Sequence, residues 1–367
     1  MISFYLFWCL GYLALLFWLA KKWPDSSSQR SFQAKKPSVS LIIPFRNEAA
    51  HAHRLINSLV HQSDSEAQTF LVDDQSEDDS FTLFQSLIAN HPQFRLLQSP
   101  GVGKKAALDF AISQTNSEVI LTSDADCVFP KDWIKEMSWR FEDPEVQLIA
   151  GPVVSSIESP SFFEAFQQLE WCSILLLTQL GFVQGKPLMC SAANLAFRKS
   201  AFEAVSGYTG NIHLLSGDDE FLLKKIVKSF GSQSCLYLPF REVLVITSPQ
   251  QTWNSLLNQR IRWASKWRLH RDFWHAATAI FTFFSQMIWL GAWVVMWFTP
   301  YPLIFVIGVL GAKIFAEKLA LGKVGSRLGV HSSWEIFLGT SLIHPGYVIL
   351  TGVLSLWRKV HWKGRKN

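Results

Sequence analysis

Long apolar stretches lie at both ends of this 367-residue chain, and they constrain its fold more than any other feature. The first, Met1–Ala20, contains no charged residue and is followed by Lys21 and Lys22. About twenty residues of helix cross the hydrocarbon core of a bilayer. A secretory signal peptide would carry its positive charge before the apolar stretch. We therefore expect residues 1–22 to form an N-terminal transmembrane anchor. Positive charge favours the cytoplasmic side, so the residues after the anchor are expected there.

Further apolar stretches lie between residues 276 and 357. Residues 276–298 contain no charge and predict a membrane span. Residues 301–321 are also apolar but include Lys313 and Glu317, which are four residues apart. On a helix these two side chains can pair with each other, which lowers the cost of inserting them, or can line a polar path.

The last apolar stretch, residues 334–357, is interrupted near Pro345. Three full spans after a cytoplasmic domain would place the basic tail, residues 358–367, outside the cell, against the preference of positive charge for the cytoplasm. Either this stretch is re-entrant near Pro345 or the rule fails here. We expect residues 276–357 as a whole to be C-terminal membrane segments.

Basic residues gather beside the apolar segments. The net charge is only +5, charged residues make up 17% of the chain and the mean hydropathy is +0.15. Lys and Arg concentrate at residues 21–22, 260–271 and 358–366, with Trp residues interleaved. This pattern favours attraction to anionic membrane lipids, and we expect no nucleic acid partner. The five cysteines are far apart and form no CxxC pair, so they are expected to be reduced thiols.

Between the apolar ends the sequence changes to an α/β pattern. A polar linker, residues 23–38, precedes a predicted domain at residues 39–250. Strands are predicted at 39–45, 69–72, 95–97 and 119–122, and helices at 49–62, 104–113 and 220–227. Continuous apolar strands that alternate with helices are typical of a mostly parallel sheet covered on both faces. In such sheets ligands bind beyond the carboxyl ends of the strands.

Two longer helices are predicted near the membrane. Residues 162–183 are apolar and aromatic but are interrupted by Glu and Gln, so we expect an interfacial helix or a domain element. Residues 253–274 carry apolar side chains at helical spacing together with Arg and Lys. We expect residues 251–275 to form an amphipathic helix on the cytoplasmic leaflet.

Acidic clusters follow the predicted strands. Asp73 and Asp74 end the second strand, Asp124 and Asp126 follow the fourth, and an acidic run at 218–220 precedes a helix. A carboxylate at the end of an apolar strand is destabilising unless it is solvated by water, paired with a positive charge or bound to a cation. Mg²⁺ and Mn²⁺ prefer oxygen ligands, often shared between carboxylates and substrate phosphates. The alternative explanation for each cluster is ordinary turn formation or helix capping.

The chain resembles family 2 glycosyltransferases. The resemblance runs from Val39 to Trp263, with each element in the order of the family. Its elements are Ser40–Glu48, Leu71–Ser76, Gly103-Lys104, Asp124-Ala125-Asp126, Ala193–Arg198, Gly217-Asp218-Asp219 and the QxxRW motif Gln259–Trp263. Such enzymes invert the configuration of the transferred sugar and have the GT-A fold, a nucleotide-binding α/β domain. The resemblance thus implies a GT-A domain with membrane segments at both ends.

The resemblance also implies roles for individual residues. Contacts with the nucleotide sugar are implied for Pro44, Glu48, Asp74, Lys104 and Asp124. Of these, Asp74 is expected to contact the nucleobase.

A divalent metal, Mg²⁺ or Mn²⁺, is expected on Asp126. Asp219 is the implied catalytic base, and Asp218 is the fallback because the family commonly has Glu at that position.

The motif residues Gln259, Arg262 and Trp263 are expected at the diphosphate and the acceptor. Gln259 and Arg262 are three apart and share a helix face. An Arg can neutralise a leaving diphosphate, and an aromatic ring can support a sugar or a lipid headgroup. The alternative is a membrane-surface helix with snorkelling Arg and interfacial Trp, and both can hold together. No histidine is assigned to a metal.

These expectations combine into a function. We expect an integral membrane enzyme that moves a sugar from a nucleotide-sugar donor, UDP-linked in preference to GDP-linked, to a membrane lipid or lipid-linked acceptor at the cytoplasmic face. The layout also resembles ceramide glucosyltransferases. A processive polysaccharide synthase extending a glycan is the alternative, although the apolar segments are few for a polymer pore. A non-catalytic membrane subunit of an export complex is the alternative from another class.

Overall fold

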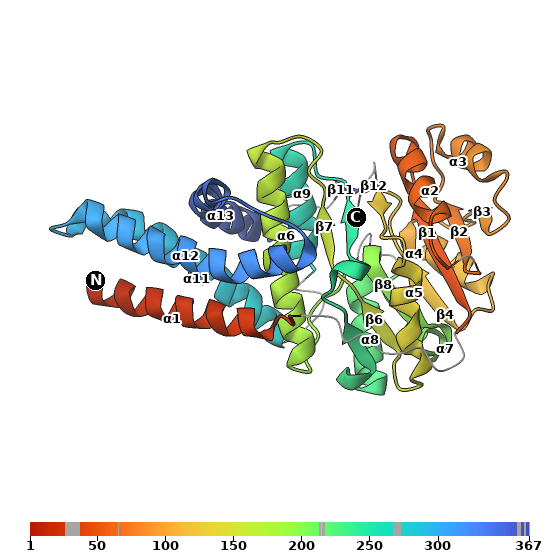
Figure 1. The fold of residues 1–367 in the computed structure, drawn as a ribbon, viewed down its shortest axis with the longest axis horizontal. Coiled ribbons are helices and arrows are strands. Elements are labelled where there is room, and N and C mark those ends of the chain that lie inside the picture. Colours follow the sequence, from red (N-terminus) through yellow and green to blue (C-terminus); the bar gives the residue numbers. More distant parts are fainter. Residues whose placement is uncertain are drawn as a thin grey trace. The chain divides into compact units, whose positions relative to one another are not determined.

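The computed structural model divides the chain into two compact units. It describes residues 1–25, 37–64, 66–212, 214, 217–266, 273–357, 361–362 and 365–366. The α/β unit comprises residues 26–156 and 181–248, and the helical unit comprises residues 1–25, 157–180 and 249–367. Figure 1 shows the fold with its elements labelled. The two units are described separately below.

A seven-stranded sheet forms the centre of the α/β unit, in the order β3-β2-β1-β4-β8-β6-β9. Its strands are β1 (Val39–Phe45), β2 (Gln68–Asp73), β3 (Phe94–Gln98), β4 (Val119–Thr122), β6 (Leu148–Ala150), β8 (Leu195–Arg198) and β9 (Cys235–Tyr237). The pairs β1/β2, β1/β4, β2/β3 and β6/β9 are parallel, whereas β8 is antiparallel to both of its neighbours. A small second sheet contains β5 (Cys127–Val128), β10 (Val245–Thr247) and β7 (Val153–Ser155).

Helices surround the large sheet. They are η1 (Ala49–His51), α2 (Ala52–Val60), α3 (Ser80–Ile88), α4 (Lys104–Ser113), α5 (Trp133–Ser138), η2 (Trp139–Glu142), η3 (Ala192–Asn194), α7 (Lys199–Ala204), α8 (Asp218–Phe230), η4 (Ser232–Ser234) and η5 (Arg241–Val243). Ile42 of β1 packs in one core cluster with residues of α4, α7 and α8. Its neighbours Leu41 and Ile43 face the other side of the sheet and are equally buried. Burial on both faces explains why β1 is apolar except at Ser40.

The Ala193–Arg198 segment of the predicted family pattern serves this scaffold. Asn194 is fully buried, and its side chain donates to the carbonyls of Pro152 (2.8 Å) and Val243 (2.7 Å). Its Oδ1 accepts a hydrogen bond from Trp133 Nε1 (2.9 Å). Arg198 donates to backbone carbonyls ahead of β6 and pairs with Glu118. These two side chains join the edge of β8 to the loops around it.

The helical unit consists mainly of long helices. They are α1 (Ile2–Lys22), α6 (Phe162–Val183, in this unit up to Leu180), α9 (Trp253–Ala264), α11 (Phe273–Val295), η6 (Met296–Phe298), α12 (Pro302–Leu328) and α13 (Trp334–Leu354). The short strands β11 (His361–Trp362) and β12 (Arg365–Lys366) follow. Within the described residues three helices are long and apolar enough to cross a membrane: Ile2–Lys22, Phe273–Phe298 and Trp334–Leu354. One of these lies near the N-terminus and one near the C-terminus, as predicted.

A buried ion pair lies among three helices of this bundle. Lys313 of α12 is fully buried and lies 2.5 Å from Glu317 Oε1, so the two residues pair as one alternative predicted. Glu317 also accepts hydrogen bonds from Tyr12 of α1 (3.1 Å) and Ser341 of α13 (2.6 Å). The carboxylate therefore links three helices. Partners for every charge are what an apolar bundle requires.

Four predicted elements, β1, β4, α4 and α6, have the predicted bounds. β2 and β3 each extend one residue further at both ends, and α8 extends beyond the predicted 220–227 at both ends. The helix predicted at 49–62 is η1 followed by α2, and it ends at Val60. α13 runs through Pro345 without interruption. The predicted helix at 253–274 is too long, because α9 ends at Ala264. The amide of Lys266 turns back to the carbonyl of Trp263, and residues 267–272 lie outside the described part of the chain.

Asn194→Ala tests the scaffold role of this side chain. The substitution removes the side-chain partner of the Val243 carbonyl and of the Trp133 indole N–H, at about 1–3 kcal/mol for each group, whereas the carbonyl of Pro152 keeps its hydrogen bond from the amide of Val245. We expect the free energy of unfolding to fall by at least about 2 kcal/mol, measured by chemical denaturation in detergent. Asn90→Ala, at an exposed position of the same unit, should leave stability unchanged. Equal stability of the two variants would contradict the assignment.

Candidate functional site

The turn before α4 joins two of the predicted donor-site elements. Gly103 has φ = 100°, a conformation that glycine adopts easily. Its N–H donates to Asp74 Oδ1 at 2.7 Å, and Asp74 is only 1% exposed at the end of β2. Asp73 instead closes a local turn, because its Oδ1 accepts from the amide of Ser76. Turn formation, the alternative explanation for this pair, therefore describes Asp73.

Lys104 connects two carboxylates from distant parts of the sequence. Its Nζ lies 2.6 Å from Asp124 Oδ1, after β4, and 3.0 Å from Asp218 Oδ2, at the start of α8. Burial opposes the charged form of Lys104, but the two carboxylates outweigh it and raise its pKa. Burial likewise opposes ionisation of Asp218, and the ammonium group of Lys104 outweighs it and lowers the pKa of Asp218. The structure thus brings these three predicted residues together.

Asp126 lies at the start of the small sheet. Its Oδ2 accepts a hydrogen bond from Thr247 Oγ1 at 3.0 Å, at the end of β10. Desolvation, together with the nearby charges of Asp124 and Glu48, raises the pKa of Asp126 to about 6. A carboxylate surrounded by negative charge is one that a cation would stabilise.

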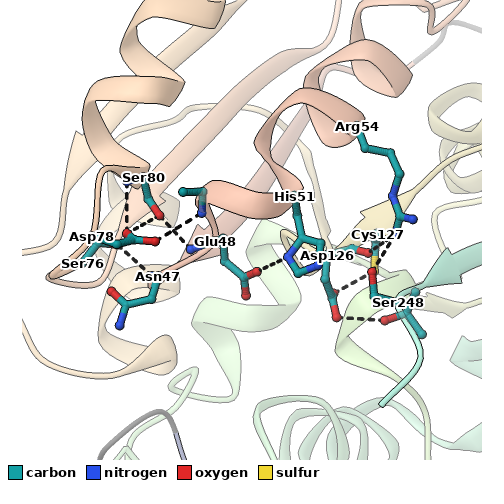
Figure 2. Close-up of polar contacts among 12 residues, drawn as sticks. Asn47, Glu48, His51, Arg54, Ser76, Asp78, Ser80, Asp126, Cys127 and Ser248 are labelled. Carbon is teal, nitrogen blue, oxygen red and sulfur yellow. Dashed lines mark hydrogen bonds and ion pairs between the residues drawn. The ribbon is translucent and has the colours of Figure 1, made fainter. Parts of the chain in front are cut away.

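His51 is a neighbour of this group that the sequence interpretation missed. Figure 2 shows Glu48 pointing toward His51, whose Nδ1 lies 2.6 Å from Glu48 Oε2, with Asp126 alongside. The hydrogen bond to Glu48, assisted by the charge of Asp126, raises the pKa of His51. The order Glu-x-x-His was the available signal, since residues three apart meet on a helical turn.

Arg54 and Ser248 were also missed. Arg54 donates to Ser248 Oγ (2.7 Å) and to the carbonyl of Asp126 (3.3 Å). Both contacts are drawn in Figure 2. No local sequence pattern indicates them, because α2 and the end of β10 are far apart in the chain. Their effect is to fix the backbone on which Asp126 stands.

The donor set at Asp126 suits a hard divalent cation shared with a substrate. In the part of the chain that the structure describes, no group of three or more His, Cys, Asp or Glu side chains is arranged to hold a metal ion. A closed protein cage is therefore not present among these residues. One or two carboxylates that leave the other positions to phosphate and water match the usual coordination of Mg²⁺.

Asp219 lies in the first turn of α8. Its Oδ2 accepts from the amide of Ala192 at 3.0 Å, and its Oδ1 accepts from the amide of Glu220 at 2.7 Å. It is more exposed than Asp218, which the Lys104 pair holds. Pro44 lies within β1 and is buried.

The QxxRW motif belongs to the helical unit and lies on α9. Arg260, within this motif, was not among the predicted site residues. Its side chain is buried, pairs with Glu170 of α6 and also donates to Gln259. Trp263 lies against the same guanidinium, and Arg262 is partly exposed. The signal for Arg260 is present only in three dimensions, since in sequence it is one Arg among several.

Comparison with known proteins finds similarity to glycosyltransferases. Residues 40–206 match the family model "Glycosyl transferase family 2". An N-acetylglucosaminyltransferase from Rhizobium meliloti (strain 1021) is 22% identical over 241 residues, covering 62% of this chain and 55% of the relative. A beta-monoglucosyldiacylglycerol synthase from a Synechocystis strain is 22% identical over 244 residues, covering 65% of this chain and 50% of the relative. The chain thus spans about half the length of these curated relatives.

A solved structure extends the comparison to nearly the whole chain. The mannosyltransferase PcManGT from Pyrobaculum calidifontis, in complex with GDP-Man and Mn²⁺, has a TM-score of 0.57 and 18% identity. The alignment covers 97% of this chain and 98% of that one. The predicted GT-A fold with its mostly parallel sheet is confirmed. Over residues 40–206, this chain carries a glycosyl transferase family 2 domain.

Proposed function

We propose that this protein is an inverting, metal-dependent hexosyltransferase. It moves a sugar from a nucleotide-sugar donor to a membrane lipid or lipid-linked acceptor at the cytoplasmic face. The observation that carries the proposal is the Lys104 bridge, which gathers Asp124 and Asp218 beyond the carboxyl ends of β2 and β4. That edge of the sheet is where an α/β domain binds its ligand.

The donor would lie along this edge. Asp74 is assigned to the nucleobase of the donor. Pro44 and Glu48 are assigned to the nucleotide-binding edge of the sheet. Lys104 and Asp124 are assigned to the remainder of the nucleotide sugar. The Lys104 ammonium stays charged because its pKa is raised, so it is available to the diphosphate. A UDP-sugar is the preferred donor, and GDP-Man in the complex of the mannosyltransferase neighbour keeps GDP-sugars in the test panel.

Asp126 is the residue that would hold Mg²⁺ or Mn²⁺. The metal, when bound, would supply positive charge against the diphosphate as it leaves. Asp126 is suited to this by its hydrogen bond from Thr247 and by the negative charge around it, which a cation would relieve. The Mn²⁺ in the solved neighbour supports the choice of a divalent ion.

Asp219 is assigned as the catalytic base. It would take the proton of the acceptor hydroxyl as that oxygen attacks the anomeric carbon and the nucleotide diphosphate leaves. Asp218 is the weaker candidate, because its pairing with Lys104 lowers its pKa and favours a carboxylate that keeps its charge without taking a proton. The amides of Ala192 and Glu220 would hold Asp219 in position.

A lipid acceptor is supported by the three apolar helices and by the beta-monoglucosyldiacylglycerol synthase among the relatives. The domain layout proposed from the sequence, with an anchor at 1–22, a linker at 23–38, a cytoplasmic catalytic domain at 39–250 and membrane segments from 276 to 357, would bring the enzyme to that acceptor. Gln259, Arg262 and Trp263 are assigned to the diphosphate and the acceptor.

Transfer from labelled donors tests the proposal directly. Membranes containing the protein are given UDP- and GDP-sugars with Mn²⁺ or Mg²⁺, and with EDTA. We expect transfer with at least one donor, its loss in EDTA, its return with added metal, and a product that extracts into organic solvent. Membranes carrying Asp126→Ala serve as the matched control.

Other outcomes would revise the proposal in defined ways. A product retained as high polymer would favour a processive synthase over lipid transfer. Absence of transfer and hydrolysis with every donor would contradict the enzyme assignment. Undiminished transfer in EDTA would contradict the role of the metal.

Asp219→Asn tests the base. The amide keeps an oxygen for the Ala192 N–H but cannot take a proton, so kcat should fall by about 10²- to 10⁴-fold. Donor KM should change little. Asp109→Asn, at an exposed position on α4, is the control and should behave as the wild type. If Asp218→Asn lowers kcat by this amount and Asp219→Asn does not, the base is Asp218.

Lys104→Met tests the bridge. Removing the ammonium group takes a charge-assisted contact from the diphosphate, so donor KM should rise about tenfold or more. The exposed Lys131→Met is the control for loss of a positive charge in the same unit. A donor KM equal in both variants would exclude Lys104 from the donor site.

A further inference from the structure

A buried ion pair joins the QxxRW helix to α6. Arg260 of α9 is 5% exposed and Glu170 of α6 is 7% exposed. The guanidinium donates through Nε to Glu170 Oε1 at 3.1 Å and through Nη2 to Oε2 at 2.9 Å. This two-point geometry fixes the plane of the guanidinium as well as its distance from the carboxylate. Neither residue belongs to the predicted site.

The same guanidinium contacts two side chains of the motif. It lies 4.3 Å from the ring centre of Trp263 and 5.4 Å from that of Trp171. The two indoles meet edge to face at 5.3 Å. Its remaining terminal nitrogen donates to Gln259 Oε1. One buried charge therefore sets the position of Gln259 and of one face of Trp263.

Stability alone is a poor reason for such an arrangement. A buried ion pair costs desolvation that apolar side chains of similar size would avoid. The pair is more useful for holding a planar group in one orientation. Here the oriented group is in contact with the first and last residues of QxxRW, and these are assigned to the diphosphate and the acceptor.

We propose that Arg260 and Glu170 are positioning residues that orient Gln259 and Trp263 toward the acceptor. The inference rests on the proposed function, because it takes QxxRW as the acceptor-side motif. Arg260 occupies one face of the Trp263 ring, and we assign the other face to a sugar or a lipid headgroup. Glu170 acts through Arg260 and does not itself touch the substrate.

Glu170→Gln and Arg260→Lys in the full chain test the inference. Each keeps a polar side chain but loses the two-point pair. Once a donor and acceptor have been found, acceptor KM should rise by about 10- to 100-fold, while donor KM should rise by much less, because most residues assigned to the nucleotide sugar lie in the α/β unit. Equal changes in both KM values would overturn the proposal, because a general loss of structure affects both substrates.

Glu317→Gln is the matched control. It removes a carboxylate of similar burial from the same unit, and its partners lie on α1, α12 and α13. We expect acceptor KM to remain near the wild-type value in this variant. An acceptor KM raised as much as in Glu170→Gln would also overturn the proposal.

Hydrogen exchange separates this inference from the proposed function. If the wild type transfers no sugar from any donor, the proposed function fails by itself. The exchange rates of amides in residues 253–264 then decide the positioning claim. Faster exchange in Glu170→Gln than in Glu317→Gln would support anchoring of the motif helix by Glu170, and equal rates would contradict it.

Discussion

The candidate site of the α/β unit depends on the ion pairs that the ammonium group of Lys104 makes. This group holds Asp124 from the end of β4 and Asp218 from the start of α8, residues that are far apart in the sequence. Without a cation between them these two carboxylates would repel each other in a partly buried place. One residue earlier, the amide of Gly103 holds Asp74. The start of α4 therefore fixes three acidic elements relative to one another, and the sheet supplies the rigid edge from which they project.

Local regularity explains which parts of the fold could be predicted. β1, β4 and α4 have the predicted bounds because their burial patterns are complete within one element. The same reasoning failed at residues 253–274, where amphipathic spacing continues beyond the end of α9 at Ala264. Periodicity reports the face that a helix would bury, and it does not report where the backbone turns.

The candidate site was predictable at the level of residue types but not of contacts. Asp73 and Asp74 look equivalent in sequence, yet one closes a turn and the other holds Gly103. Arg260 looks like one of several basic residues of a membrane-surface helix, and in the structure it is buried against Glu170. These differences depend on partners from distant segments, which no spacing rule contains. Family resemblance supplied the order of the motifs, while the fold supplied their partners.

The hydrogen bond from Tyr12 to Glu317 gives the first helix, α1, a structural role in the bundle beyond that of a membrane anchor. A simple anchor could be exchanged for any apolar segment of the same length, because lipid does not distinguish between them. α1 instead donates to a carboxylate within the bundle, and Tyr5 donates to the carbonyl of Ile288 on α11. A chain shortened at its N-terminus would leave Glu317 with one fewer donor in an apolar environment. α1 is thus better regarded as a structural part of the helical unit, and exchanging it for a generic apolar helix would disturb the bundle.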